Sequence, residues 1–154
     1  MEEGRKELVT LAVPSDLRYG EALRALLDVL SRRLEGETRT PDLNAHVISA
    51  FNEAFNNAVQ HGHGGSRDLQ VDIEVTLSSG GITIAVADRG SGFDLDTIEA
   101  PDLEELPESG LGLMIIKAVM SSVSYHRDGD RNVLTMKKDF AHPLQLGSTS
   151  RREG

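Results

Sequence analysis

Three polar side chains are spaced four residues apart in one predicted helix. Glu53, Asn57 and His61 have this spacing, and residues four apart lie on one face of an α-helix. A carboxylate such as Glu53 can accept a proton from an attacking hydroxyl or water. The amide oxygen of Asn57 is a suitable ligand for Mg²⁺, a hard cation. The helix alone supports two interpretations equally: a reactive face that holds a metal ion, or a polar face exposed to solvent.

A second motif follows a predicted buried strand. Asp88 ends the apolar run at residues 82–87 and is followed by Gly90 and Gly92. An aspartate at the end of a strand can accept a hydrogen bond from the exocyclic amine of adenine. Glycines let the backbone approach a flat ring closely. By itself, however, this pattern is more often an ordinary turn after a strand.

A third motif, Gly110, Leu111 and Gly112, opens another predicted helix. The free N–H groups and the dipole at a helix start favour a phosphate group, although a flexible linker is the alternative for this segment alone. The sequence contains no Gly-x-x-x-x-Gly-Lys-Ser/Thr pattern, which excludes a P-loop. In this order the three motifs supply an acid, a metal ligand, an adenine acceptor and phosphate donors. Together they predict a site for ATP and Mg²⁺.

The elements that must position these motifs follow from hydrophobic periodicity. Short or alternating apolar runs predict strands at residues 8–13, 69–77, 82–87, 123–127 and 133–137. Apolar side chains at helical spacing predict helices from about residue 15 to 34, from 40 to about 61, and from 112 to 120. The predicted fold is α+β, a two-layer sandwich with helices on one face of a mixed, mainly antiparallel sheet.

Composition limits the partners that the protein can have. The chain has 154 residues, 38% of them hydrophobic, which suits one domain. Its net charge of −9 opposes nucleic-acid binding, and no apolar run approaches the roughly 20 residues of a membrane-spanning helix. The absence of cysteine favours the cytoplasm. Because the acidity also repels a nucleotide, an ATP site here should depend on Mg²⁺ and local backbone donors.

Two other chemistries receive little support. His61 and His63 stand two residues apart in a glycine-rich segment without further ligands, so an exposed polar turn is expected there and not a metal site. Ser91 is not part of a Gly-x-Ser-x-Gly elbow, which argues against a serine hydrolase.

The three motifs resemble the N, G1 and G2 boxes of the GHKL ATPase superfamily, and the compact layout is similar to that of anti-sigma-factor serine kinases. The resemblance extends from about Leu8 to Lys138 and is most specific at residues 57–62 and 110–113. It implies the Bergerat ATPase fold. The expected domain is 8–139, between an N-terminal tail at 1–7 and a flexible C-terminal tail at 140–154.

The resemblance also implies a role for each matching residue. Glu53 would be the general base, Asn57 the Mg²⁺ ligand and Asp88 the residue that recognises adenine. The remaining nucleotide-binding positions would be His61, Gly90, Gly92, Gly110, Leu111 and Gly112.

Proteins of this type phosphorylate a serine on a small STAS-domain antagonist, bind a sigma factor in an alternative complex, and commonly form homodimers. The same activity and partners are therefore expected here. Glu108 stands where some relatives carry a basic residue, which leaves a second interpretation. In that interpretation the protein is a nucleotide-binding module that sequesters partners with little catalysis. A histidine-kinase catalytic domain or a gyrase-type ATPase is less well supported, for want of a phosphoacceptor helix or a transducer domain.

Overall fold

The computed structural model describes residues 6–32, 41–64, 67–90 and 108–140. Its strands are β1 (Lys6–Pro14), β2 (Gln70–Ser78), β3 (Gly81–Asp88), β4 (Ser122–Asp128) and β5 (Arg131–Asp139). Its helices are the 3-10 turn η1 (Leu17–Tyr19), α1 (Gly20–Ser31), α2 (Pro41–Asn57), the π-helical turn η3 (Ala58–Gly62) and α3 (Glu108–Val119). Gly92 lies outside the described residues, as does nearly all of the predicted C-terminal tail.

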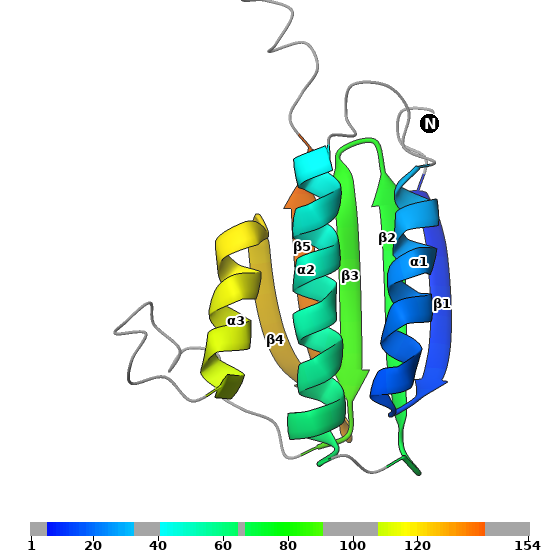
Figure 1. The fold of residues 1–154 in the computed structure, drawn as a ribbon, viewed down its shortest axis with the longest axis vertical. Helices are drawn as coiled ribbons and strands as arrows, with labels where there is room; N and C mark the ends of the chain where they lie inside the picture. The colour runs from blue at the N-terminus through cyan, green and yellow to red at the C-terminus, as the bar shows by residue number, and fades with distance from the viewer. Residues whose placement is uncertain (1–5, 33–40, 65–66, 91–107, 141–154) are drawn as a thin grey trace, which may run out of the picture.

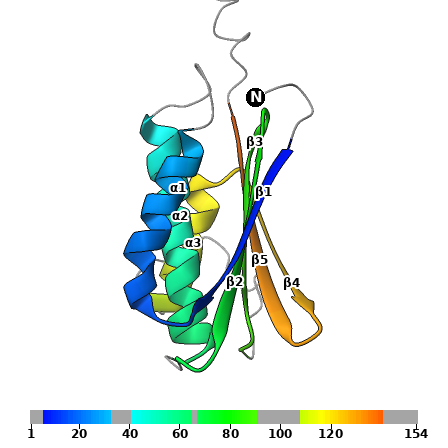
Figure 2. The same cartoon turned by 90° about the vertical axis from the view of Figure 1, so that its right-hand side faces the viewer.

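The strands form one sheet in the order β1-β2-β3-β5-β4. All four neighbouring pairs are antiparallel, and Figures 1 and 2 show α1, α2 and α3 together on one face of the sheet. The predicted α+β sandwich is confirmed, with a described sheet that is antiparallel throughout and not mixed. β1 begins at Lys6, two residues before the predicted start of the domain.

The core lies between the sheet and the central helix α2. Alternate residues of β2 and β3 point towards the helices and are almost fully buried: Val71, Ile73, Val75, Leu77, Ile82, Ile84 and Val86. On α2, Phe51 and Phe55 are buried in the same core. Their two rings stack on each other, with centroids 6.1 Å apart. Complete burial of a large apolar side chain stabilises the fold by about 1.5–3 kcal/mol. The packing of α2 therefore determines which of its faces remains available for chemistry.

Two helix ends differ from the simplest reading of the sequence. The helix predicted to end at about residue 61 continues from α2 through η3 to Gly62, so its last turn is π-helical, and the His63 N–H donates to the Ala58 carbonyl at 2.9 Å. Single π turns are frequent at functional sites. α3 begins at Glu108, four residues before the predicted start at Gly112. None of the described helices has both the length and the apolar character needed to cross a bilayer.

Phe55→Ala should lower the free energy of unfolding by about 3–5 kcal/mol, because it empties a fully buried site beneath α2. Urea unfolding measures this change. Val29→Ala on α1 is the control, since Val29 is 55% exposed and its truncation should change the free energy by no more than about 0.5 kcal/mol. Similar losses in the two variants would contradict the packing described here.

Candidate functional site

The first and third motifs meet where α2 packs beside α3 (Figure 1). A Cβ atom added to Gly112 would lie 2.8 Å from Glu53 Oε2 and 3.4–3.5 Å from the side-chain amide of Asn57. The carboxylate and the amide therefore converge on the same stretch of α3 backbone. A side chain at position 112 would take space now used by the end of the Glu53 side chain, so it would displace the carboxylate from its present position.

The amide nitrogen of Asn57 is buried and has no hydrogen-bond partner among the described residues. Leaving such a group unpaired costs about 1–3 kcal/mol, and a buried unpaired group in a native protein calls for an explanation such as a bound ion or water. Rotation of the side-chain amide by half a turn presents its oxygen in place of its nitrogen. Asn57 therefore has an unused hydrogen-bonding or metal-binding capacity next to Glu53.

This arrangement fits Mg²⁺ bound together with a nucleotide. Mg²⁺ usually takes only one or two ligands from the protein and the others from phosphates and water. The described residues contain no cluster of three or more His, Asp or Glu side chains that could hold a metal ion by themselves. Asn57 would then be the protein ligand, and the phosphates would supply further oxygen ligands.

The second motif packs against the end of the first. Asp88 is 8% exposed, and a Cβ atom added to Gly62 would lie 2.6–2.8 Å from its carboxyl group. A Cβ atom at Gly90 would collide with the backbone of Gly62. The turn after β3 and the end of the helical segment can touch only because both positions are glycine. The structure thus brings Asp88, Gly62 and Gly90 into one contact.

Asn132 is a site residue that the sequence analysis missed. It lies on β5 directly opposite Asp88 and is 2% exposed. Its amide nitrogen donates to Asp88 Oδ1 at 3.0 Å and to the Gly90 carbonyl at 2.7 Å. The signal was present in the alternation of β5, where Asn132 takes the inward position that Leu134 and Met136 take further along. A polar residue at such a position needs a buried partner.

His63 does not lie in an exposed turn, and that prediction is wrong. The ring is 7% exposed, with Nδ1 2.8 Å from Ser15 Oγ and Nε2 2.8 Å from the Arg89 backbone nitrogen. Since a backbone N–H can only donate, Nε2 is the acceptor and Nδ1 carries the proton. Burial lowers the pKa of His63, an effect that the nearby Asp88 carboxylate opposes. The neutral ring connects the end of β1 to the residue after Asp88.

The remaining predicted site residues lie in η3 and in α3. His61 lies in η3, and Gly110 and Leu111 lie in the first turn of α3, but their side chains are outside the described set. Gly112 is the fifth residue of α3, so its N–H lies beyond the free donors of the helix start. The prediction that Gly112 opens the helix is wrong, and its part in the site is the close approach to Glu53.

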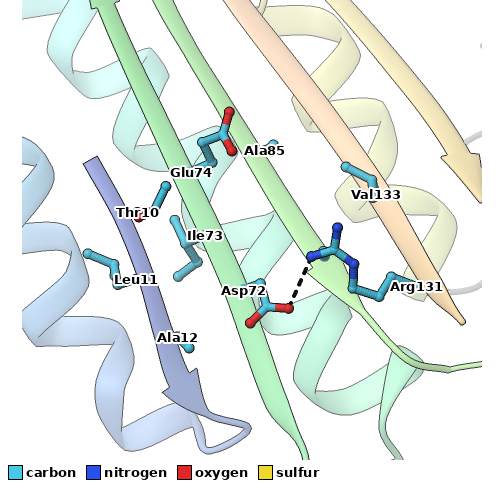
Figure 3. A pocket seen from close by; sticks show the side chains of 10 residues that line it. Thr10, Leu11, Ala12, Asp72, Ile73, Glu74, Ala85, Arg131 and Val133 are labelled. Atoms are coloured by element: carbon cyan, nitrogen blue, oxygen red, sulfur yellow. Dashed lines mark hydrogen bonds and ion pairs between the residues drawn. The ribbon is translucent and has the colours of Figure 1, made fainter. Parts of the chain in front are cut away.

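A separate pocket of about 450 Å³ lies on the sheet face away from the helices (Figure 3). It is lined by Thr10, Leu11, Ala12, Asp72, Ile73, Glu74, Ala85, Ala87, Arg131 and Val133. Asp72 and Arg131 form an ion pair at 3.3 Å beside it. None of the predicted site residues lines this pocket.

The convergence of these motifs on one end of a helical layer defines a class of protein. The family model of the histidine kinase-like ATPase domain matches residues 14–138, which include every described site residue. The chain belongs to this family.

Within this family, the chain is similar in sequence to serine-protein kinases named RsbW. The chain is 28% identical over 138 residues to the serine-protein kinase RsbW of Listeria monocytogenes serovar 1/2a, covering 84% of this chain and 85% of the relative. It is 30% identical over 127 residues to the serine-protein kinase RsbW of Oceanobacillus iheyensis, covering 76% and 77% of the two chains. These matches confirm the predicted family.

A solved structure agrees with the fold. The structure of the RsbU and RsbW domains of Rv1364c from Mycobacterium tuberculosis superposes with a TM-score of 0.64 at 16% identity. The match covers 89% of this chain and 33% of that one, so the chain spans about a third of that protein. The likeness shows the GHKL-type fold.

The buried His63 makes stability depend on pH. Its pKa in the folded chain lies below the ordinary value of 6.5, so the unfolded chain binds the proton first as the pH falls. The free energy of unfolding should therefore be highest above pH 6.5 and decrease as the pH falls through 6.5 towards the lower folded pKa. Urea unfolding between about pH 5 and pH 7 measures the slope.

His63→Gln should reduce this slope, whereas His126→Gln, at an exposed position on β4, should preserve it. A slope that is the same in the wild type and both variants would show that His63 does not titrate as its surroundings indicate.

Proposed function

We propose that this protein is an ATP-dependent serine/threonine protein kinase of the anti-sigma-factor type. The observation that carries the proposal is the convergence of the Glu53 carboxylate and the Asn57 amide on the backbone of Gly112, with the buried Asn57 nitrogen lacking a partner among the described residues. A proton acceptor and an oxygen ligand for Mg²⁺ are groups that a phosphotransfer site uses. The names of the two RsbW relatives support serine as the acceptor residue.

In this proposal, each site residue has a role in nucleotide binding or in phosphotransfer. Asp88 would accept a hydrogen bond from the exocyclic amine of adenine, and the glycines at positions 62 and 90 keep the backbone close to the ring. Asn57 would hold Mg²⁺, which neutralises charge on the phosphates. Glu53 would accept the proton of the substrate serine. The serine oxygen would form a bond to the γ-phosphorus, and the bond from that phosphorus to ADP would break. His61, Gly92, Gly110 and Leu111 would complete the nucleotide site.

The partners in this proposal come from the family resemblance. The serine acceptor would lie on a small STAS-domain antagonist, and a sigma factor would be bound in the alternative complex. A homodimer in the cytoplasm would be the working form. Sedimentation velocity of the purified chain tests the dimer independently of catalysis.

Glu53→Gln should keep Mg-ATP affinity within about threefold and lower phosphoserine formation by about 100-fold or more, because it removes the proton acceptor and preserves the side-chain shape. The tagged chain is incubated in native lysate with Mg-ATP, and captured STAS-domain proteins are analysed by mass spectrometry for phosphoserine. Glu74→Gln is the matched control, since Glu74 is an exposed glutamate on β2, in the wall of the separate pocket.

One result would contradict the role of Glu53, and another would contradict the kinase. Full phosphotransfer by Glu53→Gln would remove Glu53 as the general base. Capture of partners by the wild type with ATP bound but without phosphoserine would favour the sequestering module instead.

Asn57→Ala should weaken Mg-ATP binding at least about tenfold and remove the gain in affinity that Mg²⁺ provides. The free energy of unfolding without nucleotide should stay the same or rise, because the substitution removes a buried amide nitrogen that has no partner among the described residues. Calorimetric titration with and without Mg²⁺, together with urea unfolding, measures both. Gln60→Ala, at an exposed position one turn away, should change neither. Loss of stability in Asn57→Ala with unchanged Mg²⁺ dependence would assign Asn57 a structural role.

A further inference from the structure

Asp88 is held from one side by a chain of polar side chains that runs through β5 and β4. Asn132 lies opposite it in the strand pairing and is 2% exposed. Arg127 Nη1 is 3.0 Å from Asn132 Oδ1 and 3.4 Å from the Gly90 carbonyl. None of these contacts is needed to pair the strands, because the backbone ladder already does so.

The orientation of the Asn132 amide is determined by its neighbours. A guanidinium group can only donate, so the oxygen of Asn132 must face Arg127. The nitrogen then faces the site and donates to Asp88 Oδ1 at 3.0 Å and to the Gly90 carbonyl at 2.7 Å. Both N–H bonds of the amide are used, which leaves it no alternative orientation of equal energy.

This arrangement occupies one oxygen of Asp88. Oδ1 accepts from both the Gly90 N–H at 2.8 Å and Asn132, so the carboxylate cannot rotate without breaking two hydrogen bonds. Among the described residues no donor is recorded at Oδ2. The carboxylate is therefore held with Oδ2 as the oxygen available to a ligand.

We infer that Asn132, supported by Arg127, is a positioning residue that makes the site selective for adenine over purines that lack a 6-amino group. The inference rests on the proposed ATP site. A fixed acceptor favours a base that donates an amine to it and leaves a base without that amine unpaired. A carbonyl at the same position, as in guanine, would face the oxygen of Asp88 and be repelled. A mobile carboxylate would discriminate less.

The test compares equilibrium binding of Mg-ATP, Mg-GTP and the magnesium complex of purine riboside triphosphate, which lacks only the 6-amino group. Isothermal titration calorimetry measures each affinity. Asn132→Asp preserves the shape of the side chain and replaces the donor that faces Asp88 with an acceptor. It should weaken the binding of ATP by about 10–100-fold and the binding of purine riboside triphosphate by less than about threefold.

Arg127→Met should also weaken ATP binding relative to purine riboside triphosphate, but by a smaller factor, because it removes the cation that orients Asn132. Asn44→Ala is the matched control: Asn44 makes the same kind of bond, from its amide nitrogen to Asp28 Oδ1 at 2.8 Å, at the opposite end of α2. It should keep the wild-type ratio of ATP to purine riboside triphosphate affinity. If Asn132 had only a structural role, Asn132→Asp would weaken the binding of both nucleotides equally and leave this ratio unchanged.

The outcomes separate the inference from the function on which it rests. If the wild type prefers ATP and both Asn132→Asp and Arg127→Met keep that preference, the inference is overturned and the ATP site stands. If Asn132→Asp does not fold, as judged by circular dichroism, the ratio in Arg127→Met decides. A wild type that binds none of the three nucleotides would overturn the proposed function together with the inference.

Discussion

Burial of one face of α2 constrains the whole site. Phe51, Ala54 and Phe55 are almost fully buried against the sheet, and removal of this apolar surface from water is the main force that holds the helix in place. The helical repeat then places Glu53 and Asn57 on the other side. Because rotation of α2 about its axis would expose the phenylalanines, the direction of the carboxylate and the amide is set by core packing that lies outside the site itself.

Neighbouring elements contact the site through glycines. α3 passes the Glu53 carboxylate at Gly112, where a Cβ atom would displace the end of that side chain. The turn after β3 contacts Gly62 at Gly90, and neither of these two positions has room for a Cβ atom. The same glycines that a nucleotide would need for close contact are thus already needed for the fold. Substitution at Gly62 or Gly90 would disturb the packing of the elements before any ligand binds.

The polar groups buried around the site are of two kinds. Asn132 and His63 use their hydrogen-bonding groups within the chain, so each ties together segments distant in sequence. Asn57 buries an amide nitrogen without such a partner among the described residues. An unpaired buried group reduces stability unless a ligand completes it. The paired residues therefore stabilise the frame, while the unpaired one indicates where binding would take place.

The sequence by itself determined the order of the elements, the face on which the helices lie, and the grouping of Glu53 with Asn57, because periods of 2 and 3.6 residues are local properties of the chain. The contact of Gly112 with Glu53, and the pairing of Asn132 with Asp88 across 44 residues, were decided by the tertiary structure. His63 shows the reason most clearly: a glycine-rich neighbourhood suggests exposure, yet the ring is buried and hydrogen-bonded to Ser15 and to the Arg89 backbone. Long-range packing assigns such partners, and no local pattern encodes them.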